Sequence, residues 1–487
     1  MKKIVCHCKK WLQNEKLFCF SYILCIFFSS LCFVEYAFLG LTALHMVWAF
    51  YFIKKKCLNR QFLKNMRYSV LLLLFLASGV ITAFINKNNH LLDNLVLMYH
   101  SAICFLLLYG MHTQRSQDDA KNMMFQLFRM LTICINVLAV AGIILLITVV
   151  RVDAFGYTIG LYDNRFTGLY THPNIAAFIS MIGIIGCHLL YKRKNPVTET
   201  YYLPKWFCIL GFVIHPLTIW FADSNASFVY TCVYFFVYIC IKKDVIHNIE
   251  KNNLIRVLWL TTAFVLCNYG LRISCQNGMM ALLNQLHTPE YTASDSLQME
   301  DGMQMDYTEI EIGRTEQQDL SSGRLDSFQK AFLLFEVKPL MGVGKANIVP
   351  YGEQYLVSGF RFFDLHNGYL TILLSCGLVG FELFMLFLIS LLRKAYYLLK
   401  DFSNIPENDQ TILSVFISAL LGYGVYALFE RTILFDITFM VTIFWVILGQ
   451  FISCAIPYEN EQERTRNPLK DLSHSLQTFR NFIFRLK

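Results

Sequence analysis

The sequence predicts an all-α, polytopic helical integral membrane protein with about 12 transmembrane helices and one large extracytoplasmic loop. Of its 487 residues, 56% are hydrophobic and only 16% are charged, whereas soluble proteins carry about 25% charged residues. Apolar stretches recur at the length of about 20 residues that a helix needs to cross the hydrocarbon core of a bilayer. A β-barrel would instead show alternating segments of about 10 residues.

The expected membrane spans account for most of the chain. In chain order they lie at residues 17–34, 36–53, 68–86, 92–111, 128–150, 173–191, 206–222, 226–241, 254–273, 367–392, 411–429 and 433–455. The basic start MKKIVCHCKK leads into a full-length first span without a small-residue cleavage site, so we expect no cleaved signal peptide. The sixteen cysteines are scattered mostly within the spans, where we expect them to pack as small apolar residues.

These spans divide the chain into four parts. Residues 1–273 form an N-terminal transmembrane bundle of about nine spans, and residues 274–366 form the large extracytoplasmic loop. Residues 367–455 form the C-terminal transmembrane helices, about three spans, and residues 456–487 form a basic cytoplasmic tail.

The distribution of positive charge predicts the orientation. The net charge is +8, and 31 of the 42 Lys and Arg residues lie in the termini and loops on one side of the expected membrane. Because cytoplasmic segments carry the excess of Lys and Arg, both termini are expected in the cytoplasm of a multi-pass plasma-membrane protein. The charge therefore follows topology and does not indicate a nucleic-acid partner.

Few cationic residues remain on the outer side, and several lie close to the expected membrane surface. They are Arg165, Arg324, Arg361 and Arg431, accompanied by His366 at the entry to the tenth span. Arginine forks match phosphate oxygens and keep their charge. Histidine can accept a proton from a hydroxyl near pH 7. Together they predict chemistry on a phosphate-bearing lipid at the outer leaflet.

Each candidate also has a purely structural alternative: a cap, an anchor or a local ion pair. These alternatives are a helix cap for His366, an interfacial anchor for Arg165, a pair with Asp326 or Glu336 for Arg324, a pair with Asp364 for Arg361, a Glu430–Arg431 pair, and a polar helix entry for His172.

Four segments resemble the O-antigen ligase and Wzy-type polysaccharide polymerase superfamily, in the family's order. They are NRFTGLYTHPN (164–174), SSGRLDSFQKAFLLFEVKPLMGVG (321–344), HNGYLTILLSCGLVG (366–380) and ALFE (427–430). The many spans and the large outer loop also fit. Two positions depart from the family's pattern: Ser224-Asn225 stands where many relatives carry Ser-Arg, and Ser375-Cys376 stands where many carry a glutamate.

The resemblance implies roles for particular residues. Catalytic roles are expected for His366, Arg324 and Arg165. Substrate-binding roles are expected for Arg361, Glu430, Arg431, His172, Asn174 and Asn367. No metal and no cofactor are expected.

The resemblance also implies an activity: a glycosyltransferase that joins polyprenyl-diphosphate-linked oligosaccharide units in capsule, exopolysaccharide or O-antigen synthesis. The partners would be the lipid-linked glycan, an acceptor glycan or lipid, the bilayer, and other polysaccharide-assembly proteins. The alternative is a ligase that moves a finished glycan to a lipid or protein. A polysaccharide flippase is the rival from another class; it should show internal repeats or paired broken helices, and the sequence shows no convincing repeat.

Overall fold

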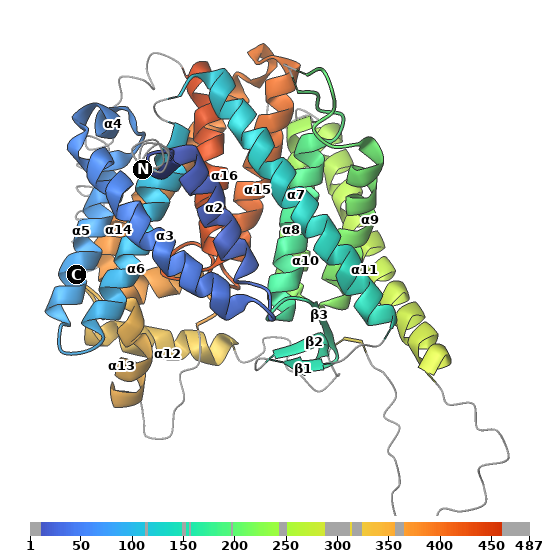
Figure 1. The fold of residues 1–487 in the computed structure, drawn as a ribbon, viewed down its shortest axis with the longest axis horizontal. Coiled ribbons are helices and arrows are strands. Elements are labelled where there is room, and N and C mark those ends of the chain that lie inside the picture. The colour runs from blue at the N-terminus through green and yellow to red at the C-terminus, as the bar shows by residue number, and fades with distance from the viewer. Residues whose placement is uncertain are drawn as a thin grey trace, which may run out of the picture.

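The structure is a computed structural model that describes residues 11–112, 115–148, 152–154, 157–195, 198–242, 251–287, 312–313, 324–355 and 365–459. It is a bundle of long helices with a small sheet at one end (Figure 1). Its helices are α2 (Glu15–Phe28), α3 (Glu35–Leu58), α4 (Arg60–Asn65), α5 (Ser69–Ile85), α6 (Leu91–Ile103), α7 (Gln117–Ile147), α8 (Pro173–Leu190), α9 (Lys205–Phe221), α10 (Asn225–Lys242), α11 (Lys251–His287), α12 (Arg324–Val337), α13 (Ile348–Tyr355), α14 (Gly368–Lys400), α15 (Glu407–Tyr426) and α16 (Phe439–Ala455). Its strands are β1 (Val152–Ala154), β2 (Tyr157–Tyr162) and β3 (Arg165–Gly168).

Each expected span overlaps one of these helices. Among the described residues, eight helices are long and apolar enough to cross a membrane, and α5 and α9 are apolar but shorter. The prediction of an all-α polytopic membrane protein is therefore confirmed, whereas the count of twelve spans stays a prediction. Helix α11 continues to His287, past the expected end of the ninth span at residue 273.

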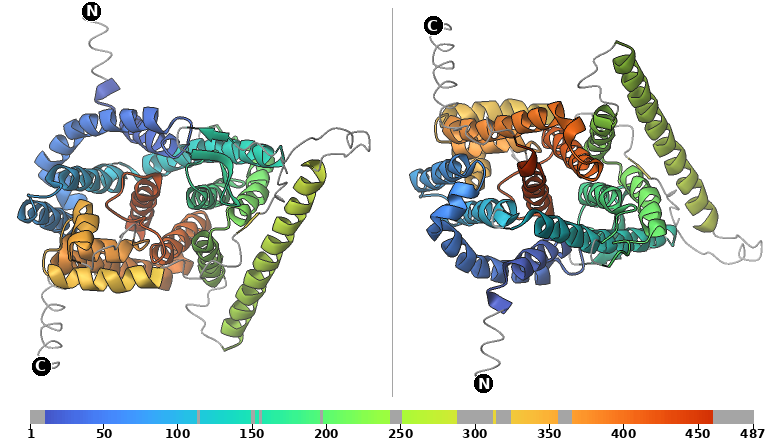
Figure 2. Two further views of the ribbon diagram at one scale, coloured as in Figure 1. Left: turned by 90° about the horizontal axis from the view of Figure 1, so that it is seen from below. Right: turned by 90° about the horizontal axis from the view of Figure 1, so that it is seen from above.

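Two helices form the interior of the bundle. In the 18-residue apolar stretch of each helix, 89% of the residues of α8 and 83% of those in the stretch that contains α16 are buried. Helix α16 lies inside the ring of other helices (Figure 2). Trp445 of α16 is fully buried, with its ring centroid 4.5 Å from that of Phe105. Helix α15 approaches α10 closely because Gly422 leaves room for the ring of Tyr230. Small residues at such contacts suit helix packing in lipid.

The connection between α7 and α8, expected as a loop, folds into a three-stranded antiparallel sheet in the order β1-β2-β3. Phe166 of β3 is buried in an apolar cluster with Leu146, Phe221 and Leu283. A hydrogen bond to Glu35 raises the pKa of Tyr157 in β2 to about 12 and ties the sheet to α3. The sheet lies at the same end of the bundle as α12 and α13 (Figure 1). We call this end the site end.

Helix α14 is broken near the site end, at Gly377, where φ is 63° and ψ is −167°. Residues 339–344 pair with the interrupted backbone. Leu378 and Val379 donate to the carbonyls of Pro339 and Leu340 at 2.8 and 3.2 Å. Residues 343 and 344 in turn donate to the carbonyls of residues 374 and 375 at 2.9 and 3.0 Å. Irregular backbone is tolerated at membrane depth only where its polar groups find partners in this way.

We predict that Gly377→Ala destabilises the protein. Its backbone lies in a region that is nearly exclusive to glycine and costs other residues about 1–3 kcal/mol, and an added Cβ would lie 2.3 Å from the carbonyl oxygen of Leu340. The melting temperature of the detergent-purified protein should fall by several degrees. Gly270→Ala in α11 is the matched control, because an added Cβ there meets nothing within 4 Å. Equal melting temperatures for the two variants would contradict the prediction.

Candidate functional site

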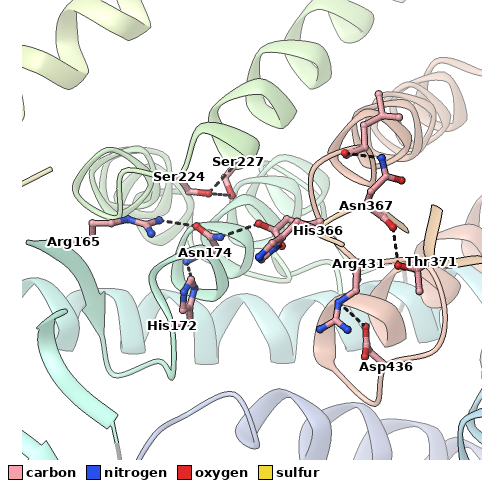
Figure 3. A network of polar contacts seen from close by, with 12 residues as sticks. Arg165, His172, Asn174, Ser224, Ser227, His366, Asn367, Thr371, Arg431 and Asp436 are labelled. Atoms are coloured by element: carbon pink, nitrogen blue, oxygen red, sulfur yellow. Dashed lines mark hydrogen bonds and ion pairs between the residues drawn. The ribbon is translucent and has the colours of Figure 1, made fainter. Parts of the chain in front are cut away.

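Four polar side chains from four segments form one continuous line at the site end (Figure 3). They are Arg165 at the start of β3, Asn174 in the first turn of α8, Glu430 just after α15, and His366 just before α14. Arg165 donates to Asn174, Asn174 donates to one oxygen of Glu430, and the other oxygen contacts His366. We call these four residues the polar line.

A tight hairpin places Arg165. Asp163 and Asn164 both have positive φ, 50° and 57°, as a two-residue type I′ turn requires. Neighbouring side chains of a strand point to opposite faces. Because Phe166 is buried in the core, Arg165 is directed away from that cluster.

The guanidinium of Arg165 is held on two sides. Its Nε donates to the carbonyl oxygen of Ala222 at 3.0 Å, and an Nη donates to Oδ1 of Asn174 at 2.7 Å. These two contacts fix the plane of the guanidinium and the direction of its N–H groups. Such an orientation is suited to an anionic ligand.

The start of α8 orders Asn174. His172 is the N-cap, and its Nδ1 accepts from the backbone N–H of Asn174 at 3.1 Å. Pro173 occupies the first helical position, where its missing N–H costs nothing. Arginine can only donate and an ionised carboxylate can only accept. The amide of Asn174, between Arg165 and Glu430, therefore has one permitted orientation.

Glu430 joins Asn174 to His366. Its two oxygens lie 2.9 Å from Nδ2 of Asn174 and 3.2 Å from Nδ1 of His366. The side chain of Glu430 is 12% exposed, whereas that of His366 is 43% exposed. Since an ionised carboxylate only accepts, the proton of a neutral His366 lies on Nδ1 and the lone pair lies on Nε2. The imidazole can thus accept a proton at its more remote nitrogen.

The backbone around His366 is also constrained. His366 has a φ of 42°, a conformation that costs a non-glycine residue free energy and persists only where neighbours enforce it. On one side, Leu365 is buried in a cluster with α12 and α13. On the other side, Asn367 is the N-cap of α14 and accepts from the N–H of Tyr369 at 3.0 Å. Asn367 also donates to the carbonyl of Leu428 at 3.1 Å.

The remaining predicted residues lie in different places. Arg431 contacts Asp436 at 3.7 Å, whereas Glu430 contacts His366 and Asn174. Arg324 is the first residue of α12, and the structure describes its backbone only. Arg361 lies outside the described residues.

Sequence reasoning did not single out Arg272, which forms an ion pair with Asp223 beside the polar line. Asp223 directly follows Ala222, whose carbonyl binds Arg165. Arg272 also donates to Oδ1 of Asn225 at 3.3 Å. A guanidinium therefore reaches Asn225, the position at which many relatives carry an arginine.

A signal for Arg272 was present in the sequence. Asn268, Arg272 and Gln276 recur every four residues, and so they share one face of a helix. In the structure, Asn268 accepts from the indole of Trp220 at 2.7 Å, and Gln276 donates to the carbonyl of Trp220 at 2.7 Å. This polar stripe binds the site-end half of α11 to the end of α9.

Two apolar grooves begin near the polar line. The first, of about 700 Å³, is lined mainly by α14, α15 and α16 and starts at Asn367, next to His366. The second, of about 770 Å³, is lined by α8, α9, α10 and α11, and at the site end its lining includes Trp220 and Leu271. We call them the α14–α15 groove and the α9–α11 groove.

The comparisons with known proteins find a family similar to part of the chain. Residues 207–385 match the model of a family described as O-antigen ligase. The match includes His366, Arg324 and Arg272, whereas Arg165, Asn174 and Glu430 lie outside it. No curated protein and no solved structure matches the chain. The resemblance to the O-antigen ligase and Wzy-type superfamily is confirmed, and with it a membrane protein of glycan ligase or polymerase type.

We predict that Asn174→Asp destabilises the protein more at pH 7.5 than at pH 5. The substitution replaces the N–H donor to Glu430 by a second carboxylate at hydrogen-bond distance, and like charges in a buried site repel. At lower pH one shared proton restores a hydrogen bond, so the loss of melting temperature should shrink.

Two variants complete the comparison. Asn174→Leu removes this partner of Arg165 and Glu430 at both pH values. It should lower the free energy of unfolding by about 1–3 kcal/mol at each. Asn65→Asp is the control for the same chemical change at an exposed position. If Asn174→Asp lowers the melting temperature equally at both pH values, the predicted contact between Asn174 and Glu430 is wrong.

Proposed function

We propose that this protein is a metal-independent glycosyltransferase that joins polyprenyl-diphosphate-linked oligosaccharide units at the outer face of the plasma membrane. The observation that carries the proposal is the polar line, which holds an imidazole and a guanidinium at opposite ends of one hydrogen-bonded set. The matched family supports glycan transfer as the general reaction.

The proposed reaction is a single displacement at the anomeric carbon of the donor. Nε2 of His366 accepts the proton of an acceptor hydroxyl while its oxygen attacks the anomeric carbon. The bond from this carbon to the diphosphate oxygen breaks, and the lipid diphosphate leaves with the electron pair. A positioned general base of this kind contributes about 10²–10⁴ in rate. Direct displacement inverts the anomeric configuration.

Arg165 is proposed to stabilise the leaving diphosphate, with Arg324 as a second cation. Negative charge grows on the diphosphate as the bond breaks, and a fixed cation is most effective where charge develops. Arg165 meets this requirement because its guanidinium is oriented by Ala222 and Asn174 before substrate arrives. Losing one such donor typically costs about 10²–10³ in rate.

The α14–α15 groove is proposed to hold the donor's isoprenoid tail. Its walls are almost entirely apolar, and Phe328 and Phe332 of α12 line it. On α14 its lining extends from Tyr369 to Ala395, which covers much of the hydrocarbon core's depth of about 30 Å. A tail in this groove would bring the attached diphosphate close to His366.

One observation bears on the flippase alternative: helix α14 is broken. Transporters use paired broken helices to build a substrate site at the bilayer midplane. Here the chain's own residues 339–344 pair with the break through four backbone hydrogen bonds. The break is therefore filled by the chain itself, which favours a structural role for it over a role in transport. A ligase remains the closer alternative to a polymerase.

We predict that His366→Ala and Arg165→Ala abolish polymer in a deletion strain complemented with each variant. Surface glycan should be analysed after each variant is shown to reach the membrane, with Arg193→Ala, at the far end of the bundle, as the matched control. Loss of polymer with single repeat units remaining supports a polymerase, whereas long lipid-linked chains that fail to reach their acceptor indicate a ligase. Unchanged glycan in both variants would overturn the site, and a retained anomeric configuration in the product would exclude the single displacement.

Glu430 is predicted to act through His366. Glu430→Gln should lower the transfer rate of the purified enzyme about 10–10²-fold, because it removes the carboxylate that fixes the imidazole. In a His366→Ala background the same change should cost little more, because groups that act as a unit are non-additive. Glu407→Gln, at the opposite end of α15, is the control. If the losses of transfer rate from Glu430→Gln and His366→Ala multiply in the double variant, Glu430 has a role separate from that of His366.

A further inference from the structure

We propose that Arg272 of α11 is a positioning residue for Arg165, because it holds the turn whose carbonyl oxygen orients the Arg165 guanidinium. The inference rests on the proposed function and deepens it, since it adds a residue to the machinery that stabilises the leaving diphosphate. Arg272 acts through Asp223 and Ala222, and does not itself contact the substrate.

The connection between α9 and α10 is short and buried. It consists of Ala222, Asp223 and Ser224, which are 0%, 4% and 1% exposed. Ala222 is the C-cap of α9, and carbonyl groups at a helix C-terminus lack partners within the helix. Arg165 supplies this partner by donating from Nε at 3.0 Å. The direction of one backbone carbonyl in the turn therefore helps to set the plane of the Arg165 guanidinium.

Asp223 controls the direction of that carbonyl. Because the peptide group is planar, the carbonyl of Ala222 and the N–H of Asp223 turn together when φ of Asp223 changes. This φ is 50°, a left-handed conformation that a non-glycine residue keeps only where its neighbours enforce it. The N–H of Asp223 donates to the carbonyl of Trp220 at 3.2 Å. A contact that fixes the side chain of Asp223 therefore also helps to fix the acceptor of Arg165.

Arg272 supplies such a contact from the neighbouring helix. It forms an ion pair with Asp223, and the two side chains are only 14% and 5% exposed. The same guanidinium donates to Oδ1 of Asn225 at 3.3 Å and lies 5.8 Å from the ring centroid of Phe228. One planar group thus binds both the connection and the first turn of α10. The rigid fork of arginine suits this task, because its donors have fixed directions.

The hairpin that carries Arg165 has a separate support. The N–H of Gly313 donates to the carbonyl of Asn164 at 2.7 Å, and Ile312 is buried in the apolar cluster at the sheet. A Cβ added at Gly313 would lie 3.8 Å from Oδ2 of Asp223, so residues 312–313 lie beside both the hairpin and the turn. If the turn shifted, the hairpin would not follow it, and the hydrogen bond between Arg165 and its carbonyl acceptor would be distorted.

A direct role for Arg272, as a further cation that binds the diphosphate, is less well supported. The carboxylate of Asp223 offsets its charge, and little of its side chain is exposed. A third possibility is that Arg272 only packs α11 against the bundle. This possibility predicts a loss of stability that is unrelated to Arg165, so the two can be separated by experiment.

The first test removes the ion pair without leaving a buried charge. Arg272→Met combined with Asp223→Asn, the neutral-pair variant, avoids the uncompensated charge that makes removal of one partner strongly destabilising, and Asn also tolerates the left-handed conformation. Its melting temperature should stay close to that of the wild type. The kcat of the purified enzyme should fall about 10–10²-fold, because a misplaced group can cost this much, and KM should stay nearly unchanged. Arg256→Met, at an exposed position near the other end of α11, is the matched control and should change neither.

The decisive comparison repeats the measurement in an Arg165→Ala background. There the neutral-pair change should lower the residual rate by no more than about twofold, because groups that act as a unit are non-additive. Packing of α11 alone would lower the rate equally in both backgrounds. Equal losses in the two backgrounds, an unchanged kcat, or a rise in KM alone would each overturn the inference. Wild-type enzyme that transfers nothing would instead remove the proposed function.

A second test needs no turnover. Polyprenyl diphosphate, the leaving group of the proposed reaction, keeps the charge that develops as the bond breaks, and its Kd is measured with the full-length protein. The neutral-pair variant and Arg165→Ala should each raise this Kd about tenfold, as expected for one charge-assisted contact. All three substitutions together should bind no more weakly than Arg165→Ala alone, and Arg256→Met should bind like the wild type.

Two results of the binding test would overturn the inference. They are a neutral-pair variant that binds polyprenyl diphosphate as tightly as the wild type, and losses of affinity that multiply when the substitutions are combined. Wild-type protein that does not bind polyprenyl diphosphate would remove the role proposed for Arg165, and this inference with it.

Discussion

The carboxylate of Glu430 is the contact on which the site depends, because it connects three separate parts of the chain. One oxygen accepts from Asn174 at the start of α8, and the other contacts His366 at the start of α14. Glu430 itself follows α15 and is nearly buried. A buried carboxylate is stable only when its oxygens are satisfied. The same contacts therefore stabilise Glu430 and fix the relative positions of the imidazole and, through Asn174, the guanidinium of Arg165.

The break in α14 contributes to the same geometry from the other side. Residues 339–344 occupy the break and continue into a buried cluster formed by α12, α13, Leu365 and Leu374. Lys338 and Asn86 join this segment to α5, with Nζ and Oδ1 2.5 Å apart. His366 therefore emerges from a part of the chain that is packed on both sides, which explains how it keeps a positive φ.

Much of this structure follows from the sequence, but the connections between its parts do not. Hydropathy locates a helix at each expected span, and Arg165, Asn174, His366 and Glu430 were all candidates. Their mutual contacts depend on packing between segments up to 256 residues apart, which local patterns do not encode. The sheet was missed because its strands are short and lie in a turn-rich loop. Arg272 was overlooked because its role depends on Asp223, a partner in the turn between α9 and α10, although the spacing of Asn268, Arg272 and Gln276 showed a polar face.

The position of the polar line beside the α14–α15 groove accords with the proposed reaction at the edge of the membrane. In that proposal, a donor held by its tail in this groove cannot diffuse away from the polar line, so apolar binding offsets its loss of translational freedom before the chemical step begins. Such prior ordering can contribute about 7–11 kcal/mol to lowering a barrier when the reacting atoms are also aligned. In the same proposal the tail supplies confinement, and the fixed side chains of Arg165 and His366 supply alignment. The rigidity of the polar line is then as important to the proposed catalysis as the chemical identity of its members, since a displaced Glu430 would misalign His366 even with the donor's tail in place.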